Sequence, residues 1–291
     1  MRPGDRDAGG MTETDAQVAE DATGLRVHRD GPVLRLTIAR EKAANALAAS
    51  TITALRDAIE EAGRSNEFRV VALTAVGKNF CTGVDLVEAN SEKRTDGQER
   101  PVRPRIGHLQ RGINLGAHEL VRAFSELQLP VVVGVRGWAA GLGNTLALLS
   151  DYIVAADTAK FWTPFVGRGF TPDSGSTWLL PRLIGLPRAK QMVLLGKPVD
   201  AERAERWGMI TELVSDDELD NRVEEVVAEF AAAATVSVGL AKTMLHRHLD
   251  ANLAQALTQE ALTEEISLRS ADFKEGIASL RERRPPRFEG R

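Results

Sequence analysis

The pattern of apolar and polar positions divides the chain into an alternating first part and a helical last part. Residues 25–38 alternate apolar and polar side chains around a Gly-Pro turn, which predicts a hairpin of two antiparallel strands. Residues 69–74 and 129–133 are apolar almost throughout and predict buried strands. The later apolar spacing is helical and predicts helices over 217–234, 238–249, 253–270 and 272–284. This order indicates an α/β core with a helical C-terminal region.

Shorter elements and loops connect these parts. Asn45 opens a predicted helix that runs through 51–62, and a second helix is predicted over 109–127. Residues 88–107 are charged and contain two prolines, so we expect a mobile loop. Further short elements are predicted as strands at 152–156 and 212–214 and as helices at 188–195 and 201–207. The polar, acidic stretch 1–22 predicts a disordered tail, which gives a layout of tail 1–22, core 23–210 and helical region 211–291.

Composition narrows the function classes. The 291 residues are 43% hydrophobic, enough for a large core. A net charge of −4 argues against nucleic acid as a partner, and no apolar run is long enough to predict a membrane span. A single cysteine, Cys81, allows no intrachain disulfide framework and is typical of a reducing compartment, so we expect a cytoplasmic protein. The five histidines show no metal-ligand pattern, and no metal is expected.

Glycine-rich turns between a buried strand and a helix start occur twice, at 77–86 and 134–146. In such a turn the unpaired N–H groups of the first helical turn point at one place and attract negative charge. If the charge develops only during a reaction, the place is an oxyanion hole. The alternative is a tight turn that lets a helix pack on a sheet.

Several segments, in this order and spacing, resemble the crotonase superfamily, the enoyl-CoA hydratase/isomerase family. They are Asn45–Leu47, Gly77–Leu86, Gly137–Asp151, Leu195–Ala204 and Phe273–Ile277. The resemblance implies a ClpP-like spiral of ββα units and a C-terminal helical region that forms homotrimers, often stacked as hexamers. It also implies an acyl-CoA thioester as ligand, with coenzyme A as part of the substrate and no separate cofactor.

The resemblance carries residue roles onto this sequence. The backbone N–H groups of Val84 and Leu142 are expected to hold the thioester carbonyl. Contacts with CoA or substrate are expected from Lys42, Ala44, Lys78, Thr82, Asp85, Val87, Phe165, Leu280 and Arg283, the last two often from a neighbouring subunit. For the charged members the alternative is an ordinary solvated surface residue.

The two glutamates that activate water in hydratases of this family have no counterpart here. Thr145 and Phe165 stand at their positions, and neither can act as a carboxylate base. Asp173, in Pro172–Gly175, resembles the aspartate of the family's isomerase and dehalogenase branches, and His118 matches a catalytic histidine of the dehalogenase branch. The alternatives are a turn former or helix cap for Asp173 and a packing role for His118.

These residues favour an enoyl-CoA or ring-bearing acyl-CoA isomerase of fatty-acid or aromatic/steroid acyl-CoA breakdown, in which Asp173 shuttles a proton and the enolate is stabilised. One alternative is an atypical enoyl-CoA hydratase or an acyl-CoA hydrolase or dehalogenase-like enzyme. Another is an acyl-CoA binder without catalysis, because both hydratase glutamates are replaced.

Overall fold

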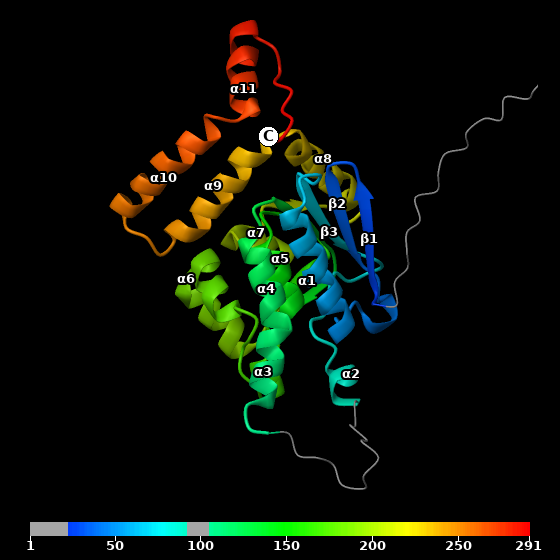
Figure 1. The fold of residues 1–291 in the computed structure, drawn as a ribbon. Coiled ribbons are helices and arrows are strands. Elements are labelled where there is room, and N and C mark those ends of the chain that lie inside the picture. The colour runs from blue at the N-terminus through cyan, green and yellow to red at the C-terminus, as the bar shows by residue number, and fades with distance from the viewer. Residues whose placement is uncertain (1–22, 92–104) are drawn as a thin grey trace, which may run out of the picture.

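A six-stranded sheet organises the molecule, in the order β1-β2-β3-β4-β6-β9. The structure, a computed structural model, describes residues 23–91 and 105–291, so the predicted tail and most of the predicted loop lie outside the described residues (Figure 1). β1 and β2 form the predicted antiparallel hairpin, and the other neighbours are parallel. The strands are β1 (Leu25–Asp30), β2 (Val33–Ile38), β3 (Val70–Ala75), β4 (Val131–Val135), β6 (Tyr152–Ala156) and β9 (Glu212–Val214).

Helices cover both faces of this sheet, which is why the central strands β3 and β4 are apolar on both sides. On one face α8 (Leu219–Ala232) packs Val223 and Val227 against Val132 and Val154. The larger core lies on the other face, under α1 (Ala49–Arg64), α4 (Ala117–Glu126) and α5 (Leu142–Leu149). Side chains alternate faces along each strand, so neighbouring residues serve the two layers.

A smaller three-stranded sheet lies beside the second glycine-rich turn. It contains β5 (Trp138–Ala140), β7 (Lys160–Trp162) and β8 (Val199–Asp200), in the order β5-β7-β8. α6 (Ser176–Leu195), broken at Gly185, lies between β7 and β8 in the chain, and α7 (Ala201–Trp207) follows β8. This arrangement of two sheets with C-terminal helices is the expected α/β crotonase fold.

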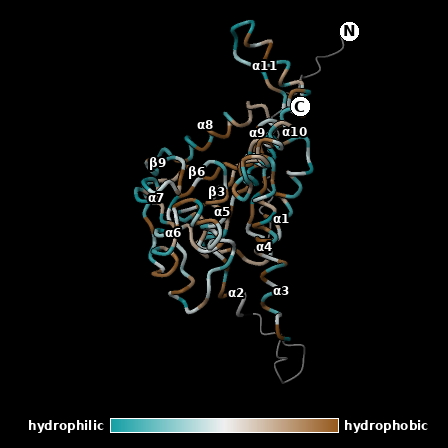
Figure 2. The backbone as a smooth tube through the Cα atoms, turned by 90° about the vertical axis from the view of Figure 1, so that its left-hand side faces the viewer, coloured by the Kyte–Doolittle hydropathy of each residue, from teal (hydrophilic) through white to brown (hydrophobic). Residues whose placement is uncertain are grey.

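The last three helices extend away from the body. α9 (Thr235–His248) is tied to the core by Lys242, whose Nζ lies 2.7 Å from Asp151 Oδ2 and 2.9 Å from the Leu129 carbonyl oxygen. α10 (Leu253–Ser267) packs on α9, and α11 (Ala271–Glu282) stands at the end of the molecule opposite α2 (Leu86–Ser91) and α3 (His108–Leu115), as Figures 1 and 2 show. The boundary at residue 210 stays a prediction, and β9 and α8, which follow it, pack with the core.

Three sequence predictions about local structure were wrong. The helix predicted to open at Asn45 begins at Ala49, because the Asn45 side chain is engaged in a turn: its Oδ1 accepts from the Arg40 N–H, and its Nδ2 donates to the carbonyls of Val76 and Asn79. The start of the predicted loop 88–107 is helical up to Ser91.

The helix predicted over 109–127 is two helices that meet at Gly116. The sequence pattern did not predict the short strand β5 or the first half of α6. Among the residues that the structure describes, no helix is long and apolar enough to cross a membrane.

Candidate functional site

The two glycine-rich turns are held together by backbone hydrogen bonds. The Cys81 N–H donates to the Trp138 carbonyl (2.9 Å), and the Ala140 N–H donates to the Cys81 carbonyl (2.8 Å). A further bond runs from the Gly141 N–H to the Trp162 carbonyl (3.0 Å), which ties the second turn to the small sheet. The two turns therefore form one rigid unit.

Glycine is required where these turns meet, because the backbones approach too closely for a side chain. A Cβ added at Gly137 would lie 2.0 Å from the Lys78 carbonyl oxygen, and one added at Gly143 would lie 2.5 Å from the Cys81 carbonyl oxygen. Gly83 also has a φ of +92°, which other residues rarely adopt. A Cβ added there would lie 3.5 Å from the Leu142 nitrogen, so Gly83 and Leu142 are neighbours.

The backbone N–H groups at this junction that have no acceptor among the described residues include those of Val84 and Leu142. Val84 forms a parallel bridge with Leu47, but the bonds of that bridge use Gly83 O and the Asp85 N–H. Leu142 is the first residue of α5, where an N–H has no partner within the helix. Neither N–H is used by the fold, and the role of the two groups as donors to a thioester oxygen stays a prediction.

A pocket of about 500 Å³ lies at the Val84 donor. Three of the residues predicted to contact CoA or substrate line it: Thr82, Asp85 and Val87, together with Val84. Its full lining is Ala43, Ala46, Thr82, Val84, Asp85, Leu86, Val87, Glu88 and Arg168. Ala44, also predicted, is linked to this wall because Thr82 Oγ1 donates to its carbonyl oxygen (3.1 Å).

Charges on one wall of the pocket are already neutralised. Arg40 lies 3.1 Å from Asp85 Oδ2 and 2.8 Å from Glu88 Oε2. The backbone N–H of Glu88 and the Arg40 guanidinium both lower the pKa of the Asp85 carboxyl. Asp85 is therefore a fixed anion that orders the first turn, and it is not poised to exchange protons at neutral pH.

Arg168 is a pocket residue that sequence reasoning missed. It follows Phe165 on a short 3₁₀ turn (Val166–Arg168), and its guanidinium lies 5.5 Å from the centre of the Trp162 ring. It forms no ion pair or side-chain hydrogen bond with another residue that the structure describes. An unpaired arginine in a segment rich in Gly and Pro has no sequence signature, because its place in the pocket depends on the fold.

Behind the second turn, uncharged residues stand at the positions where hydratases carry acids. Phe165 is buried, and a Cβ added at Gly141 would lie 3.8 Å from its ring. Thr145 is buried too, and its Oγ1 has no partner among the described residues. The same holds for both polar atoms of the Asn144 side chain, a buried residue that the sequence analysis did not single out.

Asp173 lies in the turn before α6. Its Oδ1 accepts a hydrogen bond from the Ser174 hydroxyl (2.7 Å), and its carbonyl oxygen accepts from the Ser176 N–H (3.2 Å). Ser174 has a φ of +56° and is buried, so the turn is tightly constrained. The turn-forming role considered for Asp173 is present, and its second carboxylate oxygen has no hydrogen-bond partner in the described part of the chain.

His118 lies at the start of α4. Its Nδ1 is 2.9 Å from Asn114 Oδ1, and its Nε2 is buried without a partner among the described residues. Val121, one turn further on, is 3.8 Å from the place of a Cβ added at Gly175. The face of α4 near His118 thus adjoins the Asp173 turn.

Other predicted contacts lie apart from the pocket. Lys42, beside the pocket residue Ala43, and Lys78 are exposed, whereas Leu280, in α11, and Arg283, which follows that helix, lie at the opposite end of the molecule from α2 (Figure 1). Within one chain these two cannot reach the pocket. Burial raises the pKa of the Cys81 thiol to about 12, so it is not a nucleophile at neutral pH. The described residues hold no cluster of potential metal ligands.

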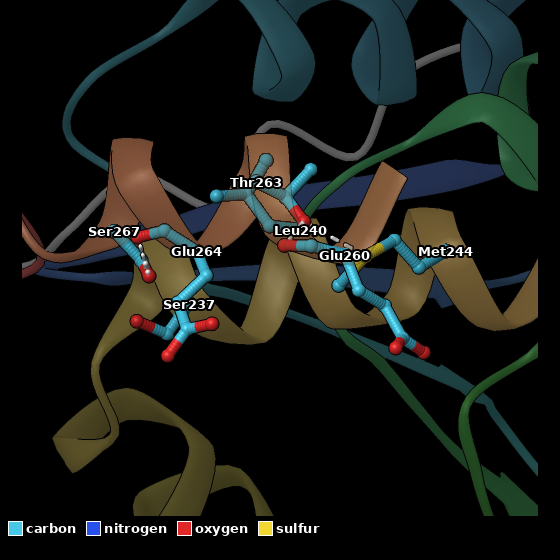
Figure 3. A pocket seen from close by; sticks show the side chains of 7 residues that line it. All are labelled: Ser237, Leu240, Met244, Glu260, Thr263, Glu264 and Ser267. Atoms are coloured by element: carbon cyan, nitrogen blue, oxygen red, sulfur yellow. Dashed lines mark hydrogen bonds between the residues drawn. The ribbon is translucent and has the colours of Figure 1, made fainter. Parts of the chain in front are cut away.

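A second hollow, of about 220 Å³, lies between α9 and α10 (Figure 3). Its lining is Ser237, Leu240, Met244, Glu260, Thr263, Glu264 and Ser267. Thr263 Oγ1 donates a hydrogen bond to the Gln259 carbonyl oxygen of its own helix. Neither of the two glycine-rich turns contributes a residue to this lining. This hollow is a gap between two packed helices, separate from the candidate site.

Comparison with known proteins decides the family. The enoyl-CoA hydratase/isomerase family matches residues 28–291. This chain belongs to that family. A 1,2-epoxyphenylacetyl-CoA isomerase of Escherichia coli is 33% identical over 91% of this chain and 97% of its own length. A short-chain-enoyl-CoA hydratase of Clostridium acetobutylicum is 29% identical over 89% and 94%.

The fold comparison agrees. An enoyl-CoA hydratase from Bacillus anthracis superposes with a TM-score of 0.83 at 26% identity, covering 92% of this chain and all of the other. The expectation of a crotonase-family acyl-CoA enzyme is confirmed. Because the relatives include both an isomerase and hydratases at similar identity, the reaction has to be argued from the site.

Proposed function

We propose that the protein is an acyl-CoA isomerase that moves a double bond, or rearranges a ring, next to a thioester. The observation that carries this proposal is the pair of free N–H groups, on Val84 and Leu142, beside an open pocket. A thioester carbonyl placed there gains negative charge when a neighbouring proton leaves. Each preorganised donor is worth roughly 3–4 kcal/mol to such a transition state.

The proton is moved by Asp173. Its carboxylate takes a proton from one carbon of the acyl chain, the electron pair moves onto the thioester oxygen, and the resulting enolate is reprotonated at another carbon. No atom is gained or lost, so one carboxylate suffices as base and then as acid. Isomerisation is favoured over hydration because Thr145 and Phe165 leave no acid at the positions where hydratases hold water.

The test is Asp173→Asn on a panel of 2-enoyl-, 3-enoyl- and aryl-CoA thioesters, with Asp217→Asn as an exposed control. We expect loss of double-bond migration by at least about 100-fold with CoA-thioester affinity retained. Turnover that survives Asp173→Asn would refute the assignment. The control keeps wild-type rates, which separates the loss of a catalytic base from a general loss of charge.

One observation favours a second candidate, addition of water to an enoyl-CoA. The buried Nε2 of His118 is unpaired and could accept the proton of a water molecule that attacks the acyl chain. Hydration of 2-enoyl-CoA without double-bond migration, abolished by His118→Gln, would favour this activity. Binding of thioesters with no turnover on any member of the panel would instead identify a non-catalytic binder.

The C-terminal helices are proposed to assemble copies of the chain. In the single chain, α9, α10 and α11 expose apolar side chains to water, which is unfavourable unless another surface covers them. Leu245, for example, is 71% exposed. The others on α9 and α10 and at their ends are Leu249, Leu253, Leu257, Leu262, Ile266 and Leu268. Analytical ultracentrifugation should give three or six copies, and a concentration-independent monomer would contradict this assembly.

Assembly would also complete the CoA site. Leu280 and Arg283 of one copy are proposed to reach the pocket of another, with the exposed Lys42 and Lys78 meeting the CoA phosphates. If so, Arg283→Ala weakens binding of CoA thioesters in the assembled protein, and mixing it with a chain defective in its own pocket restores part of the activity.

A further inference from the structure

A hydrogen bond between two side chains crosses the break between α3 and α4. Asn114 lies in the last turn of α3, His118 in the first turn of α4, and Gly116 between them ends one helix and begins the next. His118 Nδ1 is 2.9 Å from Asn114 Oδ1. Because the amide oxygen only accepts, the ring nitrogen must donate, and Nδ1 carries the proton.

The other nitrogen follows from this assignment. A neutral imidazole carries one N–H, so a proton fixed on Nδ1 leaves Nε2 with a free lone pair. Nε2 is buried and has no partner in the part of the chain that the structure describes. A buried acceptor without a donor is costly in a folded protein, and such atoms call for a functional explanation.

The surroundings of the ring supply that explanation. Val121, three residues after His118, neighbours it on the helix surface and lies 3.8 Å from the place of a Cβ added at Gly175. Gly175 follows Asp173 and Ser174 in the constrained turn before α6. The face of α4 near the ring therefore borders the turn that holds the proposed base.

We propose that Asn114 is a positioning residue that fixes the tautomer and orientation of His118, so that Nε2 faces the acyl site as an unprotonated acceptor. The proposal rests on the second candidate function at the same site, in which His118 Nε2 accepts the proton of an attacking water, and adds a residue to it. A neutral amide suits this task, because it holds the ring without a negative charge that would favour the imidazolium form. Asn114 itself touches no reacting atom.

The first test reads the ring directly, without substrate. Nitrogen NMR of the histidine-labelled full-length protein, at about pH 8.5 where an ordinary histidine is neutral, should show His118 Nδ1 protonated and Nε2 unprotonated. The signal is assigned by its loss in His118→Gln. Asn114→Leu should give a mixture of tautomers, whereas Asn114→Asp, which keeps an accepting oxygen, should keep the Nδ1–H form. A protonated Nε2 in the wild type would overturn the proposal.

The second test reads turnover on the acyl-CoA panel. Asn114→Leu should lower kcat roughly tenfold or more, with KM little changed, because a misdirected imidazole fails in the reaction step. Asn114→Asp should restore part of kcat, and more of it at high pH, because its charge orients the ring but favours the imidazolium form. Gln110→Leu, an exposed amide one turn earlier on α3, is the matched control and should behave as the wild type. Equal kcat values for Asn114→Leu and the control would overturn the positioning role.

The two tests fail in different ways. A wild type that binds thioesters but turns over none of them refutes the proposed function, while NMR still decides whether Asn114 fixes the ring. Active wild type with an unchanged tautomer in Asn114→Leu refutes the inference and leaves the proposed function standing.

Discussion

Gly143→Ala is the substitution that tests the joined turns most sharply. Gly143 is the second residue of α5 and has ordinary helical geometry, so helix propensity alone predicts that alanine stabilises the protein by up to about 1 kcal/mol. Packing predicts the opposite. The new Cβ would lie 2.5 Å from the Cys81 carbonyl oxygen and 2.6 Å from Cys81 Sγ, whereas ordinary contact begins near 3.4 Å.

The two turns must therefore separate by about 0.9 Å, the difference between those two distances. Overpacking of this kind costs about 1–3 kcal/mol of folding free energy. A donor displaced by about 1 Å from the thioester oxygen costs on the order of 100-fold in rate. Gly143→Ala should therefore lose stability and most of kcat, with the affinity for free CoA nearly unchanged.

The assay pairs urea unfolding with isomerase kinetics and uses Gly112→Ala as the control. Gly112 lies in α3, and a Cβ added there meets no atom within 4 Å, so this variant should keep its rate and equal or exceed wild-type stability. A Gly143→Ala protein that is more stable than wild type and turns over within twofold of it would refute the close packing of the two turns and the rate argument built on it.

Three further predictions address other parts of the molecule. Arg168→Ala should weaken thioester binding about tenfold with little change in kcat, whereas Arg188→Ala, which removes a similar contact to a tryptophan ring away from the pocket, should not. Cys81, whose pKa burial raises to about 12, should resist iodoacetamide at pH 8 in the folded protein, and rapid alkylation would contradict its burial. Arg284 lowers the pKa of the Glu275 carboxyl from 4.5 to about 2. The contribution of this ion pair to stability is therefore complete above pH 4.5 and is lost as the pH falls through about 2. Hydrogen exchange of the α11 amides should rise over that window and not above it.

The fold was predictable where the pattern of side chains is set by burial. The hairpin 25–38, the apolar strands β3 and β4, and the helices after residue 217 all follow from their hydrophobic periodicity. Predictions failed where a single polar contact decides the backbone. Asn45 was taken as the start of a helix, but its amide holds a turn that brings Leu47 beside Val84.

The candidate site was predictable in its backbone and less so in its side chains. Glycine-rich turns indicate close approach, and the resemblance points to two N–H groups, of Val84 and Leu142, that have no acceptor among the described residues. Arg168, Asn114 and Asn144 were not predicted, because each owes its place to a neighbour distant in the sequence or to a helix break. Residues such as Leu280 were matched to the site by resemblance alone, and one chain keeps them apart from it.

The most direct measurement is the infrared stretch of the thioester carbonyl in a ¹³C=O-labelled acyl-CoA bound to the protein. Two N–H donors that polarise this carbonyl should shift the band to lower frequency than in water, and Gly143→Ala, which separates the turns, should return much of the shift. A bound thioester whose carbonyl band stays at its solution frequency would contradict the claim that Val84 and Leu142 form the oxyanion site.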